Sequence, residues 1–113
     1  MASGHLLIIA PDAVLRHSLE FLLEAEGYTI TCYASIARTI MPENYDCVVL
    51  DHRAARRPTG DVLAFCRAAG PIVLLSGSPQ PWLAGRVFRV VQKPLLGEPL
   101  SRAIREALAS GER

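Results

Sequence analysis

Five short apolar segments alternate along this chain with segments in which apolar residues recur every three or four positions. The apolar segments span residues 5–10, 28–33, 45–50, 72–75 and 86–91. The first runs without apolar–polar alternation, as strands covered on both faces do, and the second is rich in β-branched and aromatic residues. The periodic segments 13–26, 61–69 and 97–110 predict amphipathic helices, and residues 35–41 predict a weaker one. The alternation predicts an α/β fold in which right-handed crossovers wind helices around both faces of a parallel sheet.

The connection between the fourth and fifth predicted strands departs from this alternation. Residues 77–85 contain Pro79, Pro81 and two glycines, a composition that excludes a full helix. We therefore expect the helix there to be missing or reduced to a turn. Trp82 lies in this segment, and we expect its side chain to cover the sheet surface left bare. An exposed anchor for a partner protein is the alternative for Trp82.

Composition narrows the function classes. The 113 residues predict a single domain, residues 1–113, and half of them are hydrophobic, which argues against disorder. A formal net charge of +1 argues against a nucleic-acid partner. The longest apolar run, from Leu6 to Pro11, is too short for a membrane span or a signal peptide, so we expect a cytoplasmic protein without a membrane partner. Reduced core thiols without structural zinc are predicted because no metal-ligand spacing occurs among Cys32, Cys47 and Cys66.

The candidate functional residues end the predicted strands. In a doubly wound sheet the functional crevice lies at the carboxyl ends of the strands. The residues at these ends are Ala10, Pro11, Asp12, Asp51, Ser76 and Lys93. Lys93 is the only lysine among twelve basic residues, which favours a site that requires a compact ammonium group.

At these positions the chain resembles the receiver domain of two-component response regulators. RHSLEFLLEAEGY (16–28) resembles the first helix of that family, and YDCVVLD (45–51) resembles the strand that presents its phosphoaccepting aspartate. LLSG (74–77) and QKPL (92–95) resemble the end of its fourth strand and its lysine motif. The resemblance implies a flavodoxin-like five-stranded sheet of order 2-1-3-4-5 and a role in phosphorelay signalling. It makes Asp51 the candidate phosphoacceptor and Ser76 and Lys93 the candidate phosphate contacts, with a histidine kinase or an output or regulator protein as partner.

The chain departs from the family at the metal site. The family holds Mg²⁺ with an acidic pair after the first strand, and Ala10 and Pro11 stand at those positions here. Neither side chain has an oxygen, so we expect Mg²⁺ to bind weakly or not at all, and we expect no other cofactor. Asp12, the next residue, is expected to cap the following helix, and a displaced metal ligand is the weaker alternative.

Two further departures point the same way. The family carries an aromatic residue three positions before its lysine, where this chain has Val90, with Phe88 two residues earlier. The family's fourth helix would lie in residues 77–85. We therefore expect an atypical receiver, or pseudo-receiver, that acts through protein–protein interaction and is not an enzyme. A receiver that still accepts phosphate on Asp51 from a histidine kinase is the alternative. A nucleotide- or flavin-binding domain is disfavoured because no glycine-rich or hydroxyl-rich loop follows the first strand.

Without a metal ion, a buried Asp51 requires another cation. Arg53, Arg56 and Arg57 follow it in a loop and are candidate neutralising cations, together with Lys93. Structural roles remain open: a solvated loop for the arginines, a cap or arginine partner for Asp51, and a turn residue for Ser76. No residue receives a catalytic role, because GxSxG, GxGxxG and P-loop motifs are absent and the three histidines lack the spacing of a triad or metal site.

Overall fold

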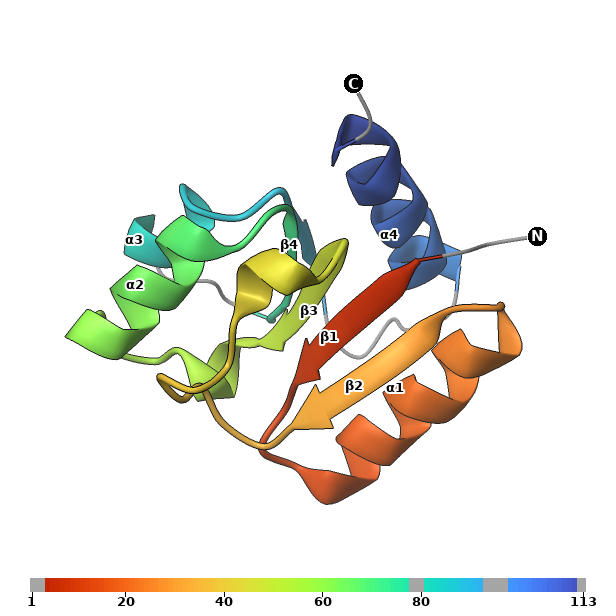
Figure 1. Cartoon of the computed structure of the whole chain (residues 1–113), viewed down its shortest axis with the longest axis horizontal. Coiled ribbons are helices and arrows are strands. Elements are labelled where there is room, and N and C mark those ends of the chain that lie inside the picture. Colours follow the sequence, from red (N-terminus) through yellow and green to blue (C-terminus); the bar gives the residue numbers. More distant parts are fainter. Residues whose placement is uncertain (1–3, 78–80, 93–97, 112–113) are drawn as a thin grey trace.

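A five-stranded parallel sheet forms the centre of the protein. The computed structural model describes residues 4–77, 81–92 and 98–111. The strands are β1 (His5–Ile9), β2 (Thr29–Tyr33), β3 (Cys47–Asp51), β4 (Ile72–Leu75) and β5 (Arg89–Val91). Their order across the sheet is β2-β1-β3-β4-β5, and every neighbouring pair is parallel (Figure 1). The predicted strand order is therefore confirmed.

Helices cover both faces of this sheet (Figure 1). On one face, α1 (Ala13–Ala25) and α4 (Glu98–Gly111) enclose a cluster of buried residues that we call the α1-side core. On the other face, α2 (Gly60–Ala68) and the short α3 (Pro81–Ala84) border a second cluster, the α2-side core. The two cores hold the helix layers on the sheet because each helix buries its apolar stripe there.

The central strands contribute side chains to both cores. Leu6 and Ile8 of β1 enter the α1-side core, whereas Leu7 and Ile9 enter the α2-side core. All four are 0% exposed. Successive side chains of a strand point to opposite faces, so a strand buried on both faces is apolar throughout. This burial explains the unbroken apolar run in the sequence.

The first two long helices begin at capping side chains. The Val14 N–H donates to Asp12 Oδ1 at 3.0 Å, so the predicted capping role of Asp12 is confirmed. The Val62 N–H donates to Thr59 Oγ1 at 3.2 Å at the start of α2. Such caps satisfy N–H groups that have no partner within the helix.

The weaker helix predicted for residues 35–41 is not formed. The segment makes bends and a turn, with the Ile40 N–H donating to the Ala37 carbonyl at 3.1 Å, and the 3-10 turn η1 (Pro42–Asn44) follows. Ile36 and Ile40, which are four residues apart, both pack against the α2-side core. Their β-branched side chains and the proline that begins η1 disfavour a helix, and so short a helix gains too little to offset its nucleation. A helix-like spacing of two isoleucines therefore reflects two separate contacts with the core and not a helix.

Among the described residues of the connection between β4 and β5, the only helix is the single turn α3, as the prolines of this segment predicted. Leu83 is 1% exposed, and Trp82 packs against the same α2-side core, in agreement with its expected position over the sheet. The Arg86 N–H donates to the Leu83 carbonyl at 2.9 Å. Because this bond ties Arg86 to α3, β5 begins at Arg89 and not at the predicted residue 86.

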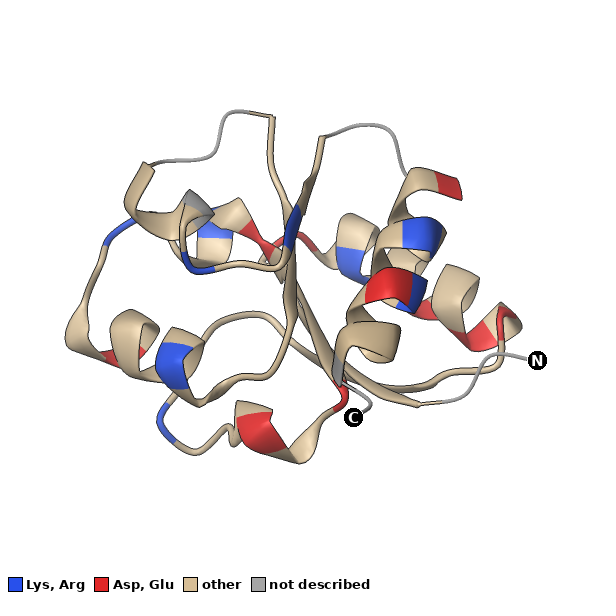
Figure 2. Cartoon of the chain, turned by 90° about the horizontal axis from the view of Figure 1, so that it is seen from above, with Lys and Arg blue, Asp and Glu red and all other residues tan. Residues whose placement is uncertain are grey.

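Charge is spread over the outer elements. Figure 2 shows basic and acidic residues interspersed along the helices and loops in this view. Within the described residues, no helix combines the length and the apolar character that crossing a membrane requires.

Candidate functional site

Asp51 and Ser76 end neighbouring strands of the sheet. Asp51 is the last residue of β3 and pairs in register with Leu75 of β4, which Ser76 follows. Asp51 is 0% exposed and Ser76 is 1% exposed. The Ser76 N–H donates to the Val91 carbonyl of β5 at 3.1 Å. Two predicted site residues therefore lie buried at the edge of the sheet where the strands end, which is the usual location of functional crevices in such folds.

Arg53 contacts both oxygens of the Asp51 carboxylate. Its backbone N–H donates to Oδ1 at 3.1 Å, and its Nη2 donates to Oδ2 at 3.2 Å. The 3-10 turn η2 (His52–Ala54) makes this geometry possible because it reverses the chain directly after β3. Of the three arginines expected near Asp51, the structure brings Arg53 to it, whereas Arg56 and Arg57 are exposed loop residues.

Asp12 is a second carboxylate near the Arg53 guanidinium. Asp12 Oδ2 is 3.8 Å from Arg53 Nη2, while Asp12 Oδ1 caps α1. The Arg53 Nη2 group is therefore near two carboxylates, one after β1 and one at the end of β3. This position accounts for Asp12 without any role as a metal ligand.

His52 also lies at the site, and no sequence pattern had predicted a role for it there. Its Nδ1 is 3.3 Å from Asp51 Oδ1 and 3.3 Å from the Leu75 carbonyl oxygen. Both neighbours are acceptors, so the ring donates a hydrogen bond here only with a proton on Nδ1. The imidazole thus adds a polar neighbour to the buried carboxylate.

Arg16 engages the two positions that lack acidic side chains. Its Nη1 donates to the Ala10 carbonyl at 2.8 Å and lies 3.3 Å from the Pro11 carbonyl, a second and longer bond. In the sequence, Arg16 was only the first residue of the segment that resembles the family's first helix, and this contact was not predicted. The position of Arg16 could have indicated the contact. A cation close to a helix N-terminus interacts unfavourably with the helix dipole, so an acceptor outside the helix is expected near it.

These residues do not fit a Mg²⁺ ion. Mg²⁺ demands an octahedral set of oxygen ligands and usually takes one or two carboxylates from the protein. Ala10 and Pro11 supply only carbonyl oxygens, which Arg16 engages, and the Asp51 carboxylate is engaged by Arg53. Within the described parts of the chain, no group of three or more His, Cys, Asp and Glu side chains is arranged to hold a metal ion.

The remaining positions discussed in the sequence, Phe88, Val90 and Lys93, lie on β5 or next to it in the chain. Val90 is 36% exposed and Phe88 is 37% exposed, so neither side chain is buried. Lys93 lies outside the residues that the structure describes, and its expected contact with Asp51 stays a prediction.

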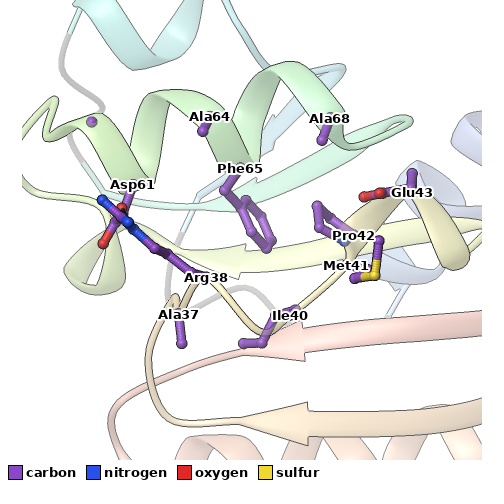
Figure 3. A pocket seen from close by; sticks show the side chains of 11 residues that line it. Ala37, Arg38, Ile40, Met41, Pro42, Glu43, Asp61, Ala64, Phe65 and Ala68 are labelled. Carbon is purple, nitrogen blue, oxygen red and sulfur yellow. Dashed lines mark hydrogen bonds and ion pairs between the residues drawn. The ribbon is translucent and has the colours of Figure 1, made fainter.

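A separate hollow of about 430 Å³ opens between α2 and residues 37–43 (Figure 3). Its floor contains the buried Ile40, Pro42 and Phe65, and the Arg38–Asp61 ion pair, with 2.9 Å between Nε and Oδ1, lies at one end. The hollow lies beside the segment 35–41, which forms no helix. Its lining includes none of the predicted site residues.

Solved structures identify the fold. A response regulator receiver domain from Clostridium thermocellum matches with a TM-score of 0.79 and 22% sequence identity, covering 95% of each chain. This chain has the receiver fold. The receiver domain of the sensor histidine kinase PA1611 from Pseudomonas aeruginosa matches with a TM-score of 0.77 and 20% identity, covering 96% of this receiver-fold chain and 99% of that one. That domain holds a magnesium ion in its active-site cleft.

The sequence is similar to that of a transcriptional regulatory protein. The chain is 28% identical over 120 residues to the transcriptional regulatory protein FixJ of Bradyrhizobium diazoefficiens, and the match covers 96% of the chain. The chain spans 58% of the length of FixJ. Full-length FixJ from B. japonicum matches in structure with a TM-score of 0.75 and 24% identity. No family model matches this receiver-fold chain.

Proposed function

We propose that this chain is an atypical receiver domain in two-component signal transduction. In this proposal residues 1–113 form one receiver-like unit that binds a histidine kinase or an output or regulator protein. Its Mg²⁺-dependent phosphorylation is weakened or lost, and the domain signals through protein–protein interaction and not as an enzyme. The fold and the similarity to FixJ support the receiver assignment.

One observation supports the atypical assignment above all others. The positions of the family's acidic pair hold Ala10 and Pro11, and their carbonyl groups accept hydrogen bonds from Arg16. Arginine side chains therefore contact the groups that remain around Asp51. Phosphorylation of a carboxylate brings two negatively charged groups together, and a receiver offsets that repulsion with a divalent cation. Without the cation, attack by Asp51 on a phosphoryl group should be slow.

The experiment is phosphorylation by a small donor. The chain is incubated with acetyl phosphate and Mg²⁺, and the intact mass is measured beside that of an ordinary receiver as positive control. We expect no phosphate adduct on this chain and a clear one on the control. Asp51→Asn serves as the matched variant, because it removes the candidate nucleophile and leaves a side chain of similar size.

The second candidate function is a working phosphoacceptor. Asp51 and Ser76 support it, because both lie buried at the ends of adjacent strands, as the family's acceptor and hydroxyl residues are expected to lie. A stoichiometric adduct that disappears in Asp51→Asn would establish this function and refute the atypical assignment.

A further inference from the structure

We propose that Arg53 is a built-in counter-cation that replaces the divalent ion at Asp51 and locks the site in one state. The inference rests on the proposed function and extends it, since it names the residue that makes the metal unnecessary. The chain has the receiver fold, but the residues around Asp51 do not fit a Mg²⁺ ion.

Arg53 is held in place by its own backbone. Asp51 Oδ1 accepts the Arg53 N–H at 3.1 Å, and this bond is also the cap of the turn η2. The same residue then returns its guanidinium to Oδ2 at 3.2 Å. A side chain anchored at both its backbone and its charged end loses less conformational freedom than an arginine that arrives from a distant element. The contact is therefore part of the local fold of residues 51–54.

The Arg53 guanidinium contacts two carboxylates. It lies 3.2 Å from Asp51 Oδ2 and 3.8 Å from Asp12 Oδ2. Asp51 is 0% exposed, and a buried carboxylate without a cation is costly. A divalent ion bound between these two side chains would occupy the same space and provide the same sign of charge. Arg53 and a metal ion should therefore exclude each other.

Arg53 lies at the boundary between the buried carboxylate and the solvent. Its side chain is 36% exposed, whereas the Asp51 side chain that it contacts is 0% exposed. Arg56 lies in the same basic loop, is exposed, and makes no contact with Asp51 in the described structure. Arg56 therefore provides a matched control of the same charge and the same loop.

The test is whether removal of Arg53 makes the fold respond to a divalent cation. Melting temperatures of the wild type, Arg53→Ala, Arg53→Gln, Arg53→Lys and Arg56→Ala are measured in millimolar Mg²⁺ or Ca²⁺ and in NaCl of equal ionic strength. Arg53→Gln keeps a hydrogen-bond donor without the charge, so it covers the case in which Arg53→Ala does not fold. Hard cations bind carboxylate oxygens, and ligands that bind only the folded state raise its melting temperature.

We expect Mg²⁺ or Ca²⁺ to raise the melting temperatures of Arg53→Ala and Arg53→Gln by about 2 °C or more over the NaCl control. The wild type, Arg53→Lys and Arg56→Ala should not respond, and adding Asp12→Asn to Arg53→Gln should remove most of the gain. If neither Arg53→Ala nor Arg53→Gln responds to the cations, or if the wild type responds equally, Arg53 is not the substitute cation.

The two proposals fail separately. A phosphate adduct on Asp51 of the wild type refutes the atypical assignment whatever the melting temperatures show. An inert wild type together with cation-insensitive Arg53 variants refutes the lock alone and leaves the atypical assignment standing.

Discussion

At the scale of single residues, burial sets the chemistry of the cysteines. Cys47, the first residue of β3, is 1% exposed, and its burial raises the pKa of the thiol to about 12. Burial, followed by the charge of Glu20, raises the pKa of the Cys32 thiol to about 11. All three cysteines are free in the structure; Cys47 and Cys66 are buried, and Cys32 is partly buried. A thiol with so high a pKa holds its proton near neutral pH and is a poor nucleophile there.

These pKa shifts predict that the protein loses stability in alkali. Above the ordinary thiol pKa of 9.0, the unfolded chain releases the Cys47 proton while the folded chain keeps it. The stabilisation is therefore fully present below a pH of about 9 and falls as pH rises toward the folded pKa, by up to about 1.4 kcal/mol per pH unit for one thiol. Urea unfolding at several pH values measures this slope, and Cys47→Ala should make it shallower. A slope that is unchanged in Cys47→Ala would show that other groups cause the loss.

At the scale of elements, Ile40 is a buried anchor of the segment between β2 and β3. Ile40 is 7% exposed and belongs to the α2-side core, whereas the adjacent Met41 is 52% exposed. The Arg38–Asp61 ion pair also joins this segment to α2, but both side chains are well exposed, and surface pairs contribute little to stability. Apolar burial at Ile40 therefore fixes the position of a segment that has no regular helix.

We predict that Ile40→Ala lowers the free energy of unfolding by about 2–4 kcal/mol, as truncation of a buried isoleucine usually does. Met41→Ala, the neighbouring control, should change it by about 0.5 kcal/mol or less, because an exposed side chain away from a core contributes little. Urea unfolding followed by circular dichroism gives both values. Equal and small effects of the two substitutions would mean that the segment is not anchored through Ile40.

At the scale of the whole molecule, the sheet joins the two cores. Leu23 of α1 is 0% exposed in the α1-side core, and Trp82 packs against the α2-side core on the opposite face. The strands between them contribute residues to both cores, so loss of one core removes the support of the other. A chain of 113 residues is also within the size range of domains that unfold in a single step.

We therefore predict one cooperative unfolding transition. Fluorescence of Trp82, the only tryptophan, and far-ultraviolet circular dichroism should give the same urea midpoint. Leu23→Ala should shift both midpoints equally, although Leu23 lies across the sheet from Trp82. A shift seen by circular dichroism but not by Trp82 fluorescence would show that the two cores unfold independently.

The sequence by itself determined the strand–helix alternation, the parallel sheet, the reduction of the helix before β5 and the capping role of Asp12. These features depend on local patterns: apolar runs and periodicity, prolines that exclude a helix, and a side chain that bonds to the backbone two residues away. The positions Ala10, Pro11, Asp51 and Ser76 were also found from the sequence, because parallel strands end at one edge of a sheet.

Only the tertiary structure decided which arginine contacts Asp51 and what the segment 35–41 becomes. Three arginines in one loop are equivalent in the sequence, and the turn η2 alone directs Arg53 back to the carboxylate. Isoleucines four residues apart fit a helix and an irregular segment equally well, until the core shows where each is anchored. In both cases the pattern shows which residues are available, and the folded chain selects among them: the local turn η2 selects Arg53, and packing on the α2-side core places the segment 35–41.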